Sequence, residues 1–357
     1  MNTKDYLNDA VALLKELIAT PSVSRDESKA ADVMQQHMEA WGLRPRREGN
    51  NVWAVCPDFD DSRKTLLLNA HIDTVKPVAT WTRQPFVPTL EGDRLYGLGA
   101  NDCGGGLVSL LQTYRWLTGQ TARGFNVVYV ASAEEEVSGK DGIVRVLPLL
   151  PHVDVAIVGE PTGMQPAIAE KGLMVIDGYA EGVSGHAARD EGVNAIYEAL
   201  DDLVWLRGYR FRKTSPLLGP TKMQVTVVES GTQHNVVPDK LHFVVDVRTN
   251  EYYQNEYVHA FLQKHMKKCK LEARSFRLHS SHIDEHHPLI EKCRQMGMTP
   301  FGSPTLSDQA LMPFPSFKLG PGQSSRSHAA DEYICLSEIE GAIENYRELL
   351  SGVELSA

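Results

Sequence analysis

The chain carries His, Asp and Glu residues whose types and order are suited to binding divalent metal ions. One of them, Asp102, lies in residues 97–106 (GLGANDCGGG), where five of ten positions are glycine. Glycines let the backbone turn sharply and let other groups approach it closely. No Lys-Ser/Thr pair follows, and the glycines lack the dinucleotide-binding spacing, so this is not a predicted phosphate site. Asp102 is therefore expected to bind a ligand, to act in catalysis or to cap the following helix.

Further polar residues follow three apolar segments that we expect to be strands. They are His71 and Asp73 after residues 65–69, Glu134, Glu135 and Glu136 after residues 125–132, Glu160 after residues 154–158, and a last group with His328, Asp331 and Glu332. In open α/β sheets, ligands bind outside the carboxyl ends of the strands. A single His there is usually just hydrogen-bonded, and a run of Glu usually faces solvent. Their joint occurrence at successive strand ends favours one common site.

Two histidines with three or four carboxylates form a ligand set suited to Zn²⁺, with Co²⁺ or Mn²⁺ as alternatives. One bridging carboxylate, plus one His and one carboxylate on each of two ions, would use five ligands and leave a Glu free to transfer protons. Asp73 could accept the second ring N–H of His71 and orient that imidazole. Because no G-x-S-x-G motif or convincing Ser or Cys nucleophile occurs, a metal-activated water is the predicted nucleophile.

The elements that must position these residues alternate between strands and helices in the first half of the chain. Apolar spacing predicts helices over residues 5–19, 28–41, 107–117 and about 141–150, and strands over 51–55, 65–69, 125–132 and 154–158. This alternation predicts an α/β domain with a mixed, mainly parallel sheet covered by helices.

After residue 172 the pattern changes to alternating faces. Strands are expected over 173–180, 221–229, 241–248 and 271–279, with helices over 192–206 and 252–265. Two helices on a four-stranded antiparallel sheet form an α+β insert at residues 174–280. Residues 1–173 and 281–357, which end in a helix over 337–350, then form one discontinuous domain.

Composition excludes several classes of function. The charge of -10 argues against nucleic acid or an anionic membrane as the main partner. No apolar run approaches the ~20 residues that span a bilayer, and no signal peptide is recognised. Five scattered cysteines without a CxxC pair favour a reducing cytoplasm.

The cluster His279, His282, His286 and His287 is interpreted as a solvated hinge, and the lysines between 264 and 270 as a helix end.

Five ordered motifs resemble those of the M20 dinuclear zinc peptidases and deacylases. They are His71-x-Asp73, Asp102 before Gly104-Gly105, Glu135-Glu136-x-x-Gly139, Gly159-Glu160-Pro161-Thr162 and His328-x-x-Asp331-Glu332. The resemblance implies two Zn²⁺ ions per subunit, with Asp102 bridging them. His71 and Glu160 would complete one site, and Glu136 and His328 the other. Glu135 would be the general acid/base and Asp73 the orienting carboxylate.

The register of the Glu triplet follows from the same resemblance, because the family's glutamate pair precedes a small loop like residues 137–139. The family pattern also implies a cis peptide bond between Asp102 and Cys103.

The resemblance also implies roles within the insert, which would act as a lid and as the contact of a homodimer. His186, in Ser184-Gly185-His186-Ala187, would reach the partner subunit's active site and stabilise the oxyanion. Asn235 and Arg248 match substrate-binding positions, and Gly320 and Gly322 belong to a loop at the substrate pocket. One stretch departs from the family: residues 304–311 (PTLSDQAL) lack the usual arginine, which affects substrate identity.

The reaction implied is metal-dependent hydrolysis of the amide bond of a small N-acyl amino acid. The overall resemblance is greatest to acetylornithine deacetylase, which favours Nα-acetyl- or Nα-succinyl-ornithine or -citrulline and a place in arginine biosynthesis. Succinyl-diaminopimelate desuccinylation, release of lysine from a carrier protein and dipeptide cleavage remain alternatives. An inactive relative that binds zinc or a peptide is an alternative of another class, and the intact Glu135 argues against it.

Overall fold

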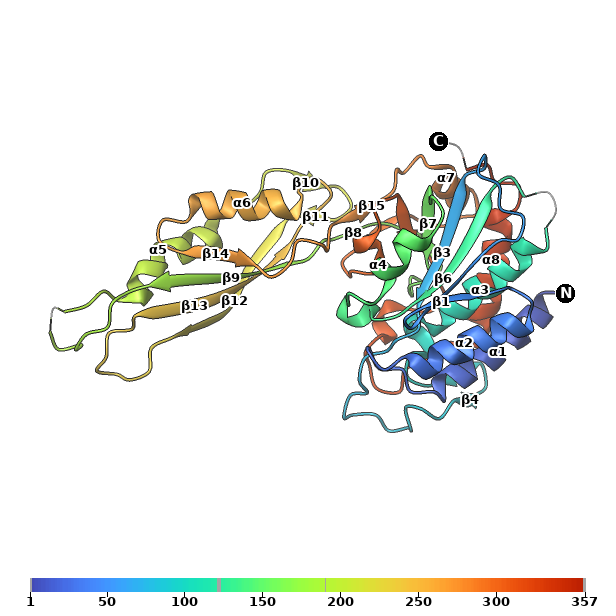
Figure 1. Ribbon diagram of the computed structural model, residues 1–357, viewed down its shortest axis with the longest axis horizontal. Helices are drawn as coiled ribbons and strands as arrows, with labels where there is room; N and C mark the ends of the chain where they lie inside the picture. Colours follow the sequence, from blue (N-terminus) through green and yellow to red (C-terminus); the bar gives the residue numbers. More distant parts are fainter. Residues whose placement is uncertain (1, 121–122, 190, 356–357) are drawn as a thin grey trace. The chain divides into compact units, whose positions relative to one another are not determined.

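The chain divides into two compact units in the computed structural model, which describes residues 2–120, 123–189 and 191–355 (Figure 1). Unit 1 comprises Met1–Ile168, His282–Phe301 and Ser307–Ala357, and unit 2 comprises Ala169–Ser281 and Gly302–Leu306. Unit 2 thus includes the short segment Gly302–Leu306, which lies outside the insert predicted from the sequence at residues 174–280.

Unit 1 is built on a mixed sheet with the strand order β1-β2-β6-β3-β7-β17-β8. The strands are β1 (Arg46–Glu48), β2 (Asn51–Val55), β3 (Thr65–His71), β6 (Asn126–Ser132), β7 (Val155–Val158), β8 (Ala167–Glu170) and β17 (Ser316–Lys318), with β15 (Ser281–His282) and β16 (Phe301–Ser303) beside β8. The central strands β6, β3, β7 and β17 run parallel. Strands β3, β6 and β7 are buried along their whole length, as continuous apolar strands covered on both faces should be. The predicted mainly parallel α/β sheet is confirmed.

Helices cover both faces of this sheet. The helices are α1 (Thr3–Ile18), α2 (Ser28–Ala40), α3 (Gly105–Thr118), α7 (Pro288–Gln295) and α8 (Leu336–Leu350) in one apolar core, and α4 (Ile143–Val146) in another. Alternate residues of β3 enter different cores, with Leu66 and Leu68 in the first and Leu67 in the second. The helix expected over 141–150 is shorter, because Pro148 enters a 3₁₀ turn, Leu147–Leu149, directly after α4.

Short elements in unit 1 carry or flank several of the predicted site residues. They are a kinked turn at Ala100–Gly104, 3₁₀ turns at Glu135–Val137, Asp308–Leu311 and Ser324–Arg326, and the small sheet β18-β5-β4 made by Tyr333–Cys335, Arg94–Tyr96 and Thr89–Glu91. Strands of three residues are too short to show a hydrophobic period, so the sequence did not predict this small sheet.

Unit 2 is an antiparallel sheet with two helices packed on it, as predicted (Figure 1). Its strands are β12 (Lys222–Ser230), β13 (Lys240–Arg248), β9 (Met174–Glu181) and β14 (Lys270–Ala273), in that order, its helices are α5 (Ala195–Gly208) and α6 (Asn255–His265), and β10 (Thr214–Ser215) and β11 (Gly219–Pro220) form a hairpin. The fourth strand is shorter than residues 271–279, because Ala273 already pairs with Ile176, near the start of β9. In the described part of the chain, no helix combines the length and apolar character needed to cross a membrane.

Candidate active site

Three neighbouring strand ends bring the predicted residues together. Strand β3 lies between β6 and β7 in the sheet, and the three strands are parallel. His71 is the last residue of β3, Glu135 follows β6 by three residues, and Glu160 follows β7 by two. Since the carboxyl ends of parallel strands meet at one edge of a sheet, residues far apart in the sequence converge there.

Asp102 lies between the two histidines. Its Oδ1 is 3.3 Å from Nε2 of His71, and its Oδ2 is 3.5 Å from Nε2 of His328. The peptide bond between Asp102 and Cys103 is cis, which confirms the expectation from the sequence. Each oxygen of one carboxylate is thus directed at a different imidazole.

Each histidine also faces a second carboxylate. Glu136 Oε2 is 2.9 Å from Nε2 of His328, and Glu160 Oε1 is 3.7 Å from Nε2 of His71. The side chains of Glu136 and Glu160 are 7% and 12% exposed, so water contributes little to their solvation. The structure therefore brings all five predicted ligands into two overlapping sets that share Asp102.

The hydrogen bonds of His71 leave a place for a cation. Nδ1 of His71 is 2.8 Å from the main-chain oxygen of Asp73, which can only accept, so Nδ1 carries the proton. In the neutral ring, Nε2 then presents a lone pair to the oxygens of Asp102 and Glu160. Glu160 Oε1 is buried and accepts no hydrogen bond from any described residue. The neighbouring acceptors also raise the pKa of the His71 ring well above its usual range, so they favour a positive charge at this place, and a divalent metal ion could supply it instead of the proton on Nε2.

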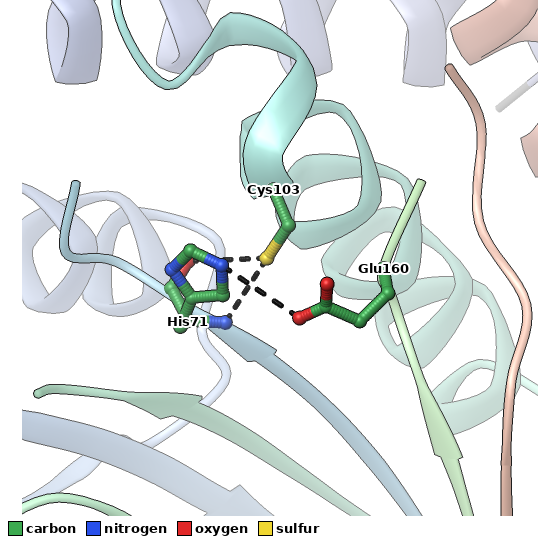
Figure 2. A group of neighbouring side chains, drawn as sticks. All are labelled: His71, Cys103 and Glu160. Atoms are coloured by element: carbon green, nitrogen blue, oxygen red, sulfur yellow. Dashed lines mark hydrogen bonds and ion pairs between the residues drawn. The ribbon is translucent and has the colours of Figure 1, made fainter. Parts of the chain in front are cut away.

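Cys103 adds a thiol to this cluster. Figure 2 shows its sulfur beside His71 and Glu160, and potential donor atoms of the three residues lie within 4.8 Å of one another. Sγ accepts a hydrogen bond from the main-chain N–H of His71 at 3.2 Å and donates to its carbonyl at 3.5 Å. The sequence singled out only the neighbouring Asp102, because a lone buried Cys carries no motif.

Asp73 holds the turn that carries the glutamates. Its Oδ1 accepts from the main-chain N–H of Glu135 at 3.0 Å, and its Oδ2 accepts from that of Glu136 at 3.2 Å. The Asp73 carboxylate lies farther from the His71 ring, at 3.5 Å from Nδ1, than its own main-chain oxygen does. Asp73 therefore contacts His71 through its carbonyl and the glutamate turn through its carboxylate.

The three consecutive glutamates point in different directions. Glu135 Oε2 is 4.0 Å from Nε2 of His71, and Glu136 contacts His328. Glu134 instead accepts a hydrogen bond from the main-chain N–H of Asp141 at 3.4 Å. Two adjacent glutamates thus face the cluster, and the first of the triplet does not.

The clustered carboxylates perturb one another. Burial raises the pKa of Glu160 to about 8, and the charge of Asp102 acts in the same direction. Burial, followed by the charge of Glu160, raises the pKa of Glu135 well above its usual range. The hydrogen bond to Glu136 raises the pKa of His328 to about 9. Buried like charges of this kind are typical of sites that bind cations or transfer protons.

The match to a family model decides the family. Residues 67–352 match the model of peptidase family M20/M25/M40. The chain belongs to this family. Relatives include succinyl-diaminopimelate desuccinylases of Dinoroseobacter shibae, 30% identical over 275 residues (72% of each protein), and of Delftia acidovorans, 27% identical over 288 residues (72% of this chain and 74% of the relative).

Solved structures of the M20 family share this fold. The YXEP protein of Bacillus subtilis, described as a dinuclear metal-binding peptidase, has a TM-score of 0.75 at 17% identity over 97% of this chain and 98% of that one. Aminopeptidase PepT of Bacillus cereus has the same TM-score and identity over 96% and 98%. Family membership and the cluster of donor atoms together identify the M20 chain as a metal-dependent amidohydrolase.

Asp308 and Ser132 of this M20 chain form a second layer of contacts that the sequence did not predict. Asp308 is 3% exposed, and its Oδ2 accepts from Ser132 Oγ at 2.6 Å. Burial raises its pKa to about 6. Its charge is one of those that raise the pKa of Glu135. Asp308 lies in the stretch that lacks the family's arginine, and that departure was the available signal.

Gly320 and Gly322 lie on the loop after β17, at two positions where the backbone packs so closely against other segments that a side chain would not fit. A Cβ at Gly320 would lie 2.5 Å from the carbonyl oxygen of Glu160, and one at Gly322 would lie 2.3 Å from Oδ1 of Asn101. Both glycines allow this loop to approach segments that carry predicted ligands.

Unit 2 holds the remaining predicted residues of the M20 chain. His186 is exposed, and its Nδ1 accepts from the main-chain N–H of Ala188 at 3.1 Å. It bridges to Val236 beside Asn235, whose carbonyl accepts from the N–H of Ala187. Arg248 is paired with Asp246 at 2.9 Å. None of the four histidines between 279 and 287 belongs to a potential metal-binding group among the described residues.

Proposed function

We propose that the chain hydrolyses the amide bond of an N-acylated α-amino acid, using a pair of divalent metal ions. The observation that carries this proposal is the position of Asp102 between His71 and His328, each of which faces a further carboxylate. His71 and Glu160 would hold one ion, Glu136 and His328 the other, and Asp102 both. Zinc is the preferred metal for this N/O donor set, with Co²⁺ or Mn²⁺ as substitutes.

Glu135 is the proposed general acid/base of the reaction. When bound, the ions would lower the pKa of a water molecule and polarise the acyl carbonyl. Glu135 faces the cluster without pairing with His328, and its raised pKa suits a group that both accepts and returns a proton. Glu135 would take the proton of the attacking water and return it to the amine as the amide bond breaks. The hydrogen bond from its main-chain N–H to Asp73 holds it in place.

We also propose that unit 2 mediates a homodimer. Strand β12 lies at the edge of its sheet, and helix α5 exposes Tyr197, Leu200 and Val204 at helical spacing, at 71%, 46% and 58%. An open edge strand next to an apolar helix face favours pairing with a second copy.

His186 would then donate from one subunit to the oxyanion in the site of the other. Its Nδ1 accepts a hydrogen bond, so the neutral ring carries its proton on Nε2, where it can donate.

The proposed acyl group is succinyl, and the amine part is an amino acid such as ornithine, citrulline or diaminopimelate. The name of the relatives, succinyl-diaminopimelate desuccinylase, supports the succinyl group. The overall resemblance of the sequence supports ornithine or citrulline, for which an acetyl group is the second possibility. Arg248, Asn235, Gly320 and Gly322 are the proposed contacts of the substrate.

A substrate panel tests this proposal. The Zn²⁺-loaded protein is incubated with N-acetyl and N-succinyl derivatives of ornithine, citrulline, lysine and diaminopimelate, and the released amine is measured. A Glu135→Gln protein is the matched control for background hydrolysis. We expect release from at least one succinyl compound, faster than from its acetyl counterpart. Hydrolysis of none of these compounds by protein with full metal content would contradict the proposal, and hydrolysis of the acetyl compounds alone would contradict the succinyl assignment.

A further inference from the structure

Glu332 is a buried carboxylate that binds the loop carrying Asp102. Its side chain lies 3% exposed, four residues after His328. Oε1 accepts hydrogen bonds from the main-chain N–H groups of Asn101 at 2.8 Å and Asp102 at 2.9 Å. Oε2 accepts from the N–H of Gly99 at 3.1 Å. Three main-chain N–H groups of one turn, those of Gly99, Asn101 and Asp102, therefore donate hydrogen bonds to one carboxylate.

Asn101 makes the reciprocal contact from the same turn. Its side chain is fully buried, and its Nδ2 donates to the carbonyl of Gln323 at 3.1 Å and to Ser327 Oγ at 3.3 Å. Its Oδ1 accepts from the N–H of Gln323 at 2.9 Å. Asn101 thus binds the loop before His328, and Glu332, four residues after His328, binds back to the turn. These two contacts form an interlock between the turn of Asp102 and the loop of His328.

We propose that Glu332 is a positioning residue for the metal centre, which sets the direction of the Asp102 carboxylate relative to His328. One carboxyl group thus satisfies three N–H groups that would otherwise be buried without an acceptor, so the turn is held firmly. The N–H of Asp102 lies one bond from its Cα, so fixing it restricts where the side chain points. The 3.3 and 3.5 Å distances from Asp102 to the two imidazoles depend on that direction.

Loss of Glu332 has a defined physical consequence. Three buried N–H groups would lose their acceptor, and a buried donor without a partner is unfavourable enough to make the turn rearrange. Asp102 could then no longer face both histidines at once. Groups that orient metal ligands in this way change metal affinity by 10–100-fold when they are replaced.

Metal affinity, measured by competition with a chromophoric chelator for Zn²⁺, tests this role without use of a substrate. Glu332→Ala is expected to weaken Zn²⁺ binding by about 10–100-fold. Glu332→Gln keeps one oxygen for Asn101 and Asp102 and loses only the acceptor for Gly99, so its loss should be less than about tenfold. Asp331→Asn is the matched control, because Asp331 accepts from the N–H groups of Thr82 and Arg83 instead. It should bind Zn²⁺ within about twofold of the unaltered protein.

Several outcomes would overturn the inference. A folded Glu332→Ala protein with unchanged Zn²⁺ affinity, or an equal loss in Asp331→Asn, would show that Glu332 does not position the site. So would a shift in thermal unfolding of the metal-free variant without a change in affinity, the sign of a merely structural role. If Glu332→Ala does not fold, Asn101→Ser breaks the other half of the interlock, and at least a fivefold loss is expected there.

The inference rests on the proposed metal centre, and the same titration separates the two. Unaltered protein that binds no Zn²⁺ would refute the metal centre. Unaltered protein that binds Zn²⁺, with Glu332 and Asn101 variants that bind it equally well, would refute only the role of Glu332.

Discussion

Glu136 and His328 are 192 residues apart in the chain, yet Oε2 of the first lies 2.9 Å from Nε2 of the second. The contact joins the turn after β6 to the loop before β18. Glu135, one residue earlier, approaches His71 instead. Glu135 and Glu136 therefore have different proposed roles, general acid/base and metal ligand, and mutation of each residue can tell these roles apart.

Replacement of Glu135 and Glu136 should give opposite phenotypes. Glu135→Gln should lower kcat by at least about 10²–10⁴-fold, because it removes the proton acceptor, while metal content stays near that of the unaltered protein. Glu136→Gln should lose metal from the site that includes His328. Elemental analysis of the purified variants, together with kcat, checks both. If the two phenotypes were exchanged, the register of base and ligand would be wrong by one residue.

Metal binding should release protons between pH 6 and 8. The pKa of Glu160 in the metal-free chain is about 8, and only the ionised carboxylate binds a cation. His328, another proposed ligand, must also lose its proton, and its pKa is about 9, so apparent affinity should rise by up to about a hundredfold per pH unit below pH 8 and level off only above about pH 9. Titration calorimetry in buffers of different ionisation enthalpy measures the released protons. An affinity independent of pH over this range would contradict the prediction.

The same raised pKa has a stability consequence with a defined sign. The ordinary value is 4.5, so the folded metal-free chain holds this proton more tightly than the unfolded chain does. Its contribution to stability is full below about pH 4.5 and is lost as the pH rises through about 8. Saturating Zn²⁺ should remove this loss in denaturant titrations.

Mixed dimers should recover activity from two inactive proteins. If His186 acts in the partner's site, a Glu135→Ala and His186→Ala pair yields one site with an intact base and an intact donor. Restored turnover after subunit exchange, measured on the substrate found in the panel, is the expected result. His186→Ala mixed with a Glu135→Ala/His186→Ala protein is the control and should stay inactive. A fully active monomer, or a fully active His186→Ala protein, would refute the shared site.

Gly106→Ala should be strongly destabilising. A Cβ at this position would lie 1.6 Å from the carbonyl oxygen of Gly159, a main-chain atom that cannot move aside without shifting the segment before Glu160. We expect a loss of at least about 3 kcal/mol in the free energy of unfolding. Gly341→Ala, in helix α8 with nothing within 4 Å of the added carbon, is the control and should gain up to about 1 kcal/mol. Denaturant unfolding of both proteins checks the contrast.

The sequence by itself determined the order of the main helices and strands and which residues lie near the strand ends, although β3 extends to His71, two residues beyond its predicted end. The apolar runs of β3, β6 and β7 predicted buried parallel strands, and that arrangement places His71, Glu135 and Glu160 at one edge of the sheet. The motifs predicted the family and the cis peptide bond of Asp102, and both are confirmed. These features depend on local periodicity and on residue order, which a sequence contains directly.

Only the tertiary structure decided which atoms of these residues meet. The carbonyl of Asp73 rather than its carboxylate contacts the His71 ring most closely, and Cys103 and Asp308 join the surroundings of the site without a motif of their own. The three hydrogen bonds of Glu332 connect a late loop to an early turn. Hydrogen bonds depend on ångström distances between distant segments, and those distances are set by packing of the whole fold rather than by residue spacing.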